Sequence, residues 1–198
     1  GAKVIQIRAV EFANKYKVSV RVLSSFEPGD GTLISLEEKN MENGLVSGIA
    51  FQKDQMKYTL HGVSDTPGIA YSILGPLSDA NIEVDVIVQN ISVEGKTDFT
   101  FTVSKEDEHA TSQVINQMKN SLDFSEVIID SEIAKVSLVG VGMRTHAGIA
   151  STAFKALSEN DVNIQMISTS EIKITIVINE NAVDTAVKAL HKAFELEK

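Results

Sequence analysis

The loop at residues 62–69 has the residue types and spacing that best suit the binding of a small ligand. It reads Gly-Val-Ser-Asp-Thr-Pro-Gly-Ile and lies between an expected strand and an expected helix. The carboxylate of Asp65 can bind an ammonium group, and the free N–H groups at the start of a helix can bind a carboxylate. One short loop would then recognise both ends of a zwitterion. The alternative interpretation is that Asp65 or Thr66 simply caps the helix, and the residue types leave both open.

Polar residues on two expected strands form a second candidate group. Gln89 ends one strand, and Asn163 lies on the matching strand of a later segment. With a two-residue period, Asp85 and Gln89 are expected to share the face of the sheet away from the core, as are Asn163 and Gln165. Such amides are often only solvated. A polar face beside a glycine-containing loop nevertheless predicts a small binding groove.

Most catalytic and cofactor chemistry is disfavoured by the residues present. The chain has no cysteine, which excludes disulfides, thiol nucleophiles and thiolate metal sites. Its four histidines have no ligand spacing. The Gly140-Val141-Gly142 string resembles the start of a dinucleotide-binding motif, but Thr145 stands where that motif needs a third glycine. The sequence therefore predicts no active site, no metal and no cofactor in this chain.

Composition narrows the choice of partners. The chain has 198 residues and a formal net charge of −9. Nucleic-acid binding is not expected, because contact with the phosphate backbone depends on Lys and Arg. No apolar run is long enough to cross a membrane, and charged residues interrupt the N-terminal segment that a signal peptide would need. The expected location is the cytoplasm, and the expected size is one large domain or two small ones.

A tandem duplication organises the chain. The string Gly68-Ile69-Ala70 recurs as Gly148-Ile149-Ala150, and the two copies then run in register at an offset of 80, with two extra residues in the loop of the second copy. Each copy alternates strand and helix periods in the order β-α-β-β-α-β, which predicts an α+β fold of two ferredoxin-like modules. In the first copy strands are expected at 58–63, 82–88, 99–103 and 127–129, and helices at 69–80 and 104–118. In the second copy strands are expected at 136–141, 162–169 and 172–178, and helices at 149–157 and 183–194.

The second copy lacks a fourth strand. We predict that the apolar segment 45–52 fills this vacancy and makes the two modules, 54–131 and 132–198, inseparable. The segment 1–43, with a helix expected at 8–16 and a strand at 18–22, is too short to be a domain. Within the first helix of copy one, Gly75-Pro76 predicts a kink or an early end.

Several strings are similar to the regulatory half of aspartate kinases (aspartokinases). They are Gly-Val-Ser-Asp-Thr-Pro-Gly at 62–68, Val-Gln-Asn-Ile-Ser at 88–92, Asp-Phe-Thr-Phe-Thr at 98–102, Lys-Val-Ser-Leu-Val-Gly-Val-Gly-Met at 135–143 and Ile-Ser-Thr-Ser-Glu-Ile-Lys-Ile at 167–174. The two modules look like ACT domains, which bind amino acids, and residues 1–43 look like the end of a kinase domain with a linker. A departure at Gln6-Ile7, where the family usually has His-Pro, affects only this N-terminal part.

The resemblance implies a function. The parent enzyme would convert L-aspartate to 4-phospho-L-aspartate with ATP and Mg²⁺, while this chain would hold no catalytic residue and be inactive alone. It would bind threonine, lysine or both for feedback inhibition, form a homodimer through its ACT modules, and act on a kinase domain or a catalytic subunit. An ACT-type regulatory subunit of another amino-acid biosynthetic enzyme is the alternative.

The resemblance also assigns roles to residues. Asp65 would hold the ammonium group of the effector and Gln89 would contact the effector. The backbone around the helix start would hold its carboxylate, at Thr66, Pro67, Gly68 and Ile69. The second module would supply Asn163 and Ile164. Four further residues would tune affinity or form a second site: Ser92, Thr100, Ser168 and Glu171.

Overall fold

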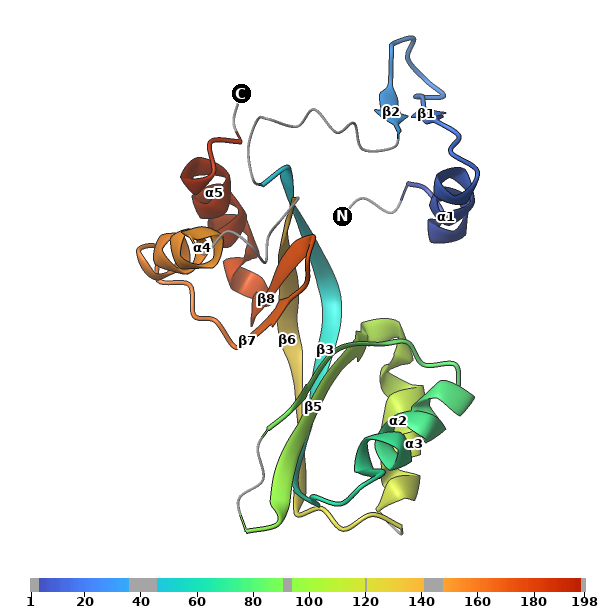
Figure 1. Cartoon of the computed structure of the whole chain (residues 1–198), viewed down its shortest axis with the longest axis vertical. Coiled ribbons are helices and arrows are strands. Elements are labelled where there is room, and N and C mark those ends of the chain that lie inside the picture. The colour runs from blue at the N-terminus through green and yellow to red at the C-terminus, as the bar shows by residue number, and fades with distance from the viewer. Residues whose placement is uncertain (1–3, 36–45, 91–93, 120, 141–147, 197–198) are drawn as a thin grey trace. The chain divides into compact units, whose positions relative to one another are not determined.

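The computed structural model describes residues 4–35, 46–90, 94–119, 121–140 and 148–196, and the chain divides into two compact units, Gly1–Gly44 and Leu45–Lys198. In the first unit, helix α1 (Ile7–Lys15) precedes a two-stranded antiparallel hairpin of β1 (Val20–Val22) and β2 (Thr32–Ile34) (Figure 1). The helix and the first strand expected from the sequence are therefore confirmed.

The second unit is built on one antiparallel sheet of six strands in the order β4-β5-β3-β6-β8-β7 (Figure 1). Its strands are β3 (Gly48–Ser64), β4 (Val84–Gln89), β5 (Lys96–Ser104), β6 (Glu126–Val139), β7 (Met166–Thr169) and β8 (Lys173–Asn179). Its helices are α2 (Ile69–Asp79), α3 (Glu108–Met118), α4 (Gly148–Ser158) and α5 (Val183–Ala193), with short 3-10 turns at Lys105–Asp107 and Glu180–Ala182. The predicted α+β class with two β-α-β-β-α-β modules is confirmed.

The two central strands differ from the sequence prediction. Segments 45–52 and 58–63 were expected as separate strands, but residues 48–64 form the single strand β3; likewise β6 joins two segments that were expected apart. The apolar pattern of β3 breaks at Lys53-Asp54, where the register with β6 shifts and Asp54 has a φ of 59°. A bulge of this kind bends a strand without ending it.

The long strands are shared between the modules. Residues 48–52 of β3 pair with residues 135–139 of β6, which begin the second copy, whereas residues 57–61 pair with residues 126–130 at the end of the first. One sheet therefore runs through both copies. The module bounds 54–131 and 132–198 stay a prediction.

Each copy has its own apolar core. In the first, Tyr58 and Phe101 lie opposite each other on β3 and β5, with ring centroids 5.6 Å apart, and they pack against Ile73 and Leu77 of α2. In the second, β6, β8, α4 and α5 bury a purely aliphatic set, which includes Val136, Leu138, Ile176, Ala153 and Leu190. Among the described residues no helix is long and apolar enough to cross a membrane.

Helix α2 passes through Pro76 without ending there. It continues to Asp79, and the N–H of Ala80 donates to the carbonyl of Pro76 (3.2 Å). The predicted early end is therefore wrong. A proline in a helix removes one hydrogen bond and crowds the carbonyl four residues earlier, and it also crowds the Cβ of the preceding residue. Gly75 has no Cβ, so this last part of the clash is absent.

Candidate functional site

Asp65 and Gln89 lie side by side where β3 leads into α2. The Nε2 of Gln89, at the end of β4, donates to Oδ1 of Asp65 (3.4 Å), and both residues are exposed. The backbone N–H of Asp65 donates to the carbonyl of Gly95 (2.9 Å), so the start of β5 holds the loop in place. Two residues that the sequence predicted for one site, 24 positions apart in the chain, are thus brought together.

Neither Asp65 nor Thr66 caps α2 through its side chain. The N-cap residue is Gly68, which has a φ of 95° and no side-chain cap. The Thr66 carbonyl accepts from the N–H of Ile69 (3.1 Å), which is the buried first residue of the helix. The capping interpretation is therefore wrong, and the exposed carboxylate of Asp65 faces the amide of Gln89 beside a helix start.

A second carboxylate fixes the strand that leads into the loop. Asp98 on β5 accepts from the N–H of Gly62 (3.1 Å) and lies 2.9 Å from Nδ1 of His61. The Gly62 hydrogen bond is the main cause that holds the pKa of Asp98 below its ordinary value; burial acts in the opposite direction, and His61 adds to the lowering. Gly62 has a φ of 65°, and a Cβ there would lie 2.3 Å from Oγ of Ser125. The backbone approach to Asp65 therefore requires glycine at this position.

Of the two other predicted residues in the first module, one is placed by the structure. Thr100 lies on β5 opposite Val88, and its hydroxyl contacts that of Thr59 (3.0 Å). Thr100 therefore lies next to Phe99, the residue of β5 that pairs with Gln89. Ser92 lies outside the described residues.

The predicted residues of the second module lie around β7. Asn163 is exposed and Ile164 half-buried in the stretch before this strand, and Ile164 packs against the second core. Ser168 is on β7 opposite Thr175, and Glu171 is exposed in the turn to β8. In the described part of the chain, no hydrogen bond links these four residues to Asp65 or Gln89. The loop at 141–147, which corresponds in the repeat to the Asp65 loop, lies outside the described residues.

Sequence reasoning misplaced Asp85 and overlooked its partner. A register shift between Val84 and Ile87 separates Asp85 from Gln89, so the expectation that both point to one polar face is wrong. Asp85 instead accepts from Nζ of Lys135 (2.5 Å), a residue of β6 that is 5% exposed. Burial acts to raise the pKa of Asp85, but the hydrogen bond and charge of Lys135, with help from Lys173 and the N–H of Val86, lower it overall.

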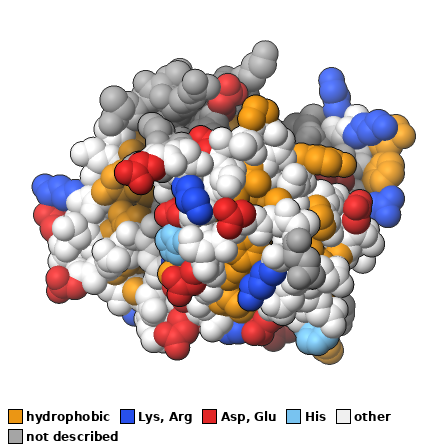
Figure 2. All heavy atoms as spheres, turned by 90° about the horizontal axis from the view of Figure 1, so that it is seen from below, with side chains coloured by type: hydrophobic (Ala, Val, Ile, Leu, Met, Phe, Trp, Pro, Cys, Tyr) orange, Lys and Arg blue, Asp and Glu red, His pale blue; other side chains and the backbone are white. Residues whose placement is uncertain are grey.

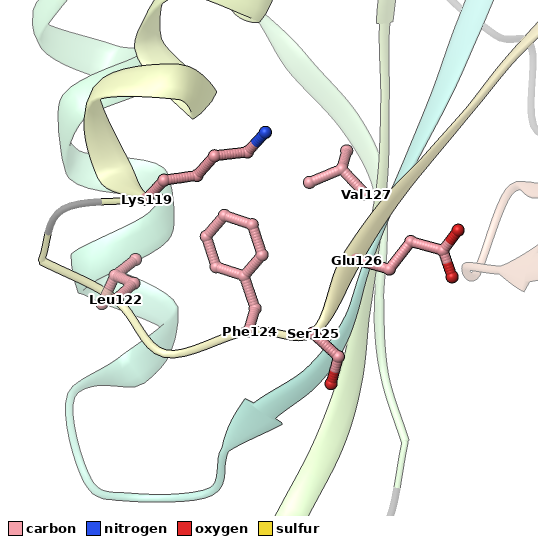
Figure 3. A pocket seen from close by; sticks show the side chains of 6 residues that line it. All are labelled: Lys119, Leu122, Phe124, Ser125, Glu126 and Val127. Carbon is pink, nitrogen blue, oxygen red and sulfur yellow. The ribbon is translucent and has the colours of Figure 1, made fainter.

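A pocket lies beside the strand segment of His61 and Gly62, because the N–H of Ser125 in its lining donates to the carbonyl of His61 (2.8 Å). It has a volume of about 530 Å³ at the end of α3 and the start of β6, and Figure 3 shows the side chains of Lys119 and Phe124 between the helix and the strand, with Glu126 pointing away from them. Its lining mixes apolar side chains with exposed polar ones, and none of the predicted site residues contributes. Among the residues that the structure describes, no group of three or more His, Asp or Glu side chains could hold a metal ion. The expectation of no cofactor in this chain stays a prediction.

The fold and the polar loop at a helix start define a class of protein. Residues 59–123 and residues 136–194 each match a model of the ACT domain. The chain therefore contains two ACT domains in tandem.

Comparison with known proteins gives the particular family. An aspartate kinase of Pseudomonas fluorescens is 57% identical over 198 residues, which is the whole of this chain and 48% of that protein. A crystal structure of aspartokinase alpha and beta subunits is 47% identical with a TM-score of 0.71, covering 76% of this chain and 99% of that one. The ligand-free regulatory subunit of aspartate kinase from Thermus thermophilus is 32% identical with a TM-score of 0.72, at the same coverage. The chain belongs to the aspartate kinase family and corresponds to its regulatory ACT region. It spans about half the length of the curated relatives that it matches.

Proposed function

We propose that this chain binds threonine, lysine or both, and that binding imposes feedback inhibition on the aspartate kinase of which it is the regulatory region. The parent enzyme would transfer a phosphoryl group from ATP, with Mg²⁺, to L-aspartate and so form 4-phospho-L-aspartate. The catalytic residues would belong to a kinase domain or catalytic subunit, so this chain would be inactive by itself. We expect it to act in the cytoplasm.

The arrangement of Asp65 beside Gln89 is the observation that supports this proposal most strongly. A carboxylate released from helix capping can accept from the ammonium group of an amino acid, and its amide neighbour offers both a donor and an acceptor. The N–H groups in the first turn of α2 have no partner within the helix and suit the carboxylate of the same ligand. Hydrogen bonds to charged groups contribute about 1.5–3 kcal/mol each, which is enough for selective binding.

A dimer would complete the site. In the described part of the chain, β4 and β7 are the two edges of the sheet, and each pairs with one neighbour. An unpaired strand edge is a natural place for a second chain to dock. We propose that the first module meets the second module of a partner chain, so that Asn163 and Ile164 of the partner subunit approach the Asp65 loop. Ser92, Thr100, Ser168 and Glu171 would then adjust affinity or form a second site.

Calorimetric titration with threonine and lysine, separately and together, tests the assignment. Asp65→Ala is expected to abolish binding with little change in thermal stability, because Asp65 is exposed and does not cap α2. Asp79→Ala, which removes an exposed carboxylate at the other end of the same helix, is the matched control and should bind as the unmodified chain does. Unchanged binding by Asp65→Ala would show that the site is elsewhere. If the unmodified chain bound neither threonine nor lysine, the effector assignment itself would be refuted.

A further inference from the structure

Two lysines on the central strands each reach across to the other module. Nζ of Lys135, on the second-module half of β6, donates to Oδ2 of Asp85 on β4 in the first module. Nζ of Lys57, on the first-module half of β3, donates to Oε1 of Gln165, which immediately precedes β7 in the second module. Lys57 also lies 3.3 Å from Oδ2 of Asp130, its neighbour across the strand pair. We call the Lys135–Asp85 and Lys57–Gln165 contacts the crossed bridges.

The crossed bridges join equivalent positions of the duplication. Before the two-residue insertion the copies are offset by 78, as Gly62 and Gly140 show, and Lys57 corresponds to Lys135 at this offset. After the insertion the offset is 80, and Asp85 corresponds to Gln165. The two lysines are thus equivalent positions of the repeat, and so are their two acceptors, Asp85 and Gln165. Each lysine contacts the acceptor of the opposite copy. A chance pair of surface contacts would not obey this exchange rule at both ends.

Each bridge is attached to an edge strand. Both β4 and β7 pair with a single neighbour in the described sheet, and Asp85 falls within the register shift of β4, where the ladder to β5 is interrupted. Pairing with β5 therefore fixes this part of β4 less firmly than a regular ladder would. The Lys135 contact adds to what holds this part of β4, beside the burial of Val86. On the other side, Gln165 is held by Lys57 and by its own N–H, which donates to the carbonyl of Val177 (2.8 Å).

The two ends of the Lys135–Asp85 bridge differ in exposure, because the side chain of Asp85 is 52% exposed while that of Lys135 is buried and only 6% exposed. Val86 follows Asp85 in the sequence, and Val177 pairs with Lys135 across the strands. Both valines are buried, although neither belongs to a module core. A buried lysine is costly unless it is paired, so the ammonium group of Lys135 constrains where the carboxylate of Asp85 can lie. Figure 2 shows acidic and basic side chains interspersed on the face of the molecule that it displays.

The edge strands are also the segments that carry candidate effector residues. Gln89 ends β4, four positions after Asp85, and Asn163 lies two positions before Gln165. We propose that Lys57 and Lys135 are positioning residues: through the crossed bridges, each module holds in place the edge segment with which the other module contacts its ligand. This proposal rests on the proposed function for the identity of the ligand, but the holding of the strands does not depend on it.

Hydrogen–deuterium exchange of the whole chain tests the holding of the strands. Lys135→Met keeps the aliphatic length and removes the charge, and it is expected to cause a loss of protection of the amides at 84–89 that Lys135→Arg largely restores. Lys57→Met is expected to do the same at 165–169. Lys155→Met is the matched control, because Lys155 is an exposed lysine of α4 whose ion pair is with Glu159, the residue just after this helix, and it should leave both segments unchanged. Protection of 84–89 that is unaltered in Lys135→Met would overturn the proposal.

Titration with threonine and lysine tests the consequence for binding. Lys135→Met and Asp85→Asn are each expected to weaken effector affinity by roughly 2- to 30-fold, and the double variant should be no weaker than either single one, since both remove the same contact. Lost protection with unchanged affinity would overturn the link to ligand binding. If the unmodified chain binds neither amino acid, the proposed function fails, and the exchange experiment alone then decides whether the crossed bridges hold the edge strands.

Discussion

The two ACT modules have the same topology but differ at equivalent positions of their cores. The pair Tyr58–Phe101 in the first module corresponds by strand register to Val136–Ile176 in the second. The first core thus contains fully buried aromatic rings. The buried residues of the second core are aliphatic, and its aromatic residues, Phe154 and Phe194, are only partly buried. The comparison teaches that the period and order of apolar residues, which both copies keep, determine this fold, while the sizes of the side chains can diverge.

The polar contacts between the modules diverge in a similar way. Lysine is kept at both ends of the crossed bridges, but its acceptor is a carboxylate at Asp85 and a neutral amide at Gln165. Asp98, which supports the candidate loop, is also in the first module and also has a lowered pKa. Titratable support for structure is therefore concentrated in the first module.

The largest expected effect comes from the aromatic core. Phe101→Ala should lower the free energy of unfolding by about 3–5 kcal/mol, whereas Ile176→Val at the equivalent position should cost about 0.5–1.5 kcal/mol, because the first leaves a far larger cavity. Urea unfolding followed by circular dichroism measures both. Since β3 and β6 run through both modules, we expect residues 45–198 to unfold in one transition that shifts as a whole. A separate, unshifted transition of the second module in Phe101→Ala would contradict this.

A smaller effect is expected from acid. The pKa values of Asp85 and Asp98 are lowered on folding from an ordinary value of 3.8, so their contribution to stability is complete above that value and is lost as the pH falls through the folded-state pKa values. The free energy of unfolding of the unmodified chain should decrease as the pH is lowered from about 5 to 2. In Asp85→Asn and in Asp98→Asn this decrease should be smaller.

The second module supplies the control for the acid experiment. Asp184→Asn removes a carboxylate on α5 whose side chain is 81% exposed and lies 3.9 Å from Nζ of Lys53. Because an exposed ion pair contributes little to stability, this variant should change the unfolding free energy less than either first-module variant. Equal slopes in all of these proteins would refute the idea that the first module carries the titratable support.

The smallest expected effect concerns one hydroxyl. Thr102 is fully buried and its Oγ1 has no hydrogen-bond partner among the residues that the structure describes, while the position that corresponds to it on β8 is Val177. Thr102→Val should therefore raise the free energy of unfolding by about 1 kcal/mol. Thr175→Val is the contrasting variant: the hydroxyl of Thr175 contacts that of Ser137 (2.9 Å), so its removal should destabilise by a similar amount. Thermal unfolding of the two variants gives the comparison, and a loss of stability in Thr102→Val would contradict it.

The sequence predicted what local periodicity and internal repetition encode. The helices from 69, 149 and 183 and the β-α-β-β-α-β order follow from apolar spacing within each copy. The continuity of β3 could not be predicted from this spacing, because Lys53-Asp54 interrupts the alternation. Only the pairing with β6 shows that the strand continues. The persistence of α2 through Pro76 also depended on the absence of a Cβ at the preceding residue, which a proline rule applied alone overlooks.

The candidate site was predictable in part for the same reason. Asp65 and Gln89 could be grouped because both flank expected element ends, and the structure places them in contact. The partners of Asp85 and Gln165 could not be found from one copy at a time, since each lies on the other copy. The sequence does contain a sign of these contacts, since Lys57 and Lys135 occupy equivalent positions of the repeat. Spacing alone, however, does not predict which residue a lysine contacts.

The pairing of β3 has a consequence for how the protein is made. Residues 48–52 leave the ribosome before any of the first module, but their partner residues 135–139 follow after that module is complete. During synthesis this part of β3 must stay unpaired while the intervening segments fold, and loop closure between such distant residues is slow. The second module therefore cannot complete its part of the sheet until residues 135–139 have been made, which is after the whole of the first module.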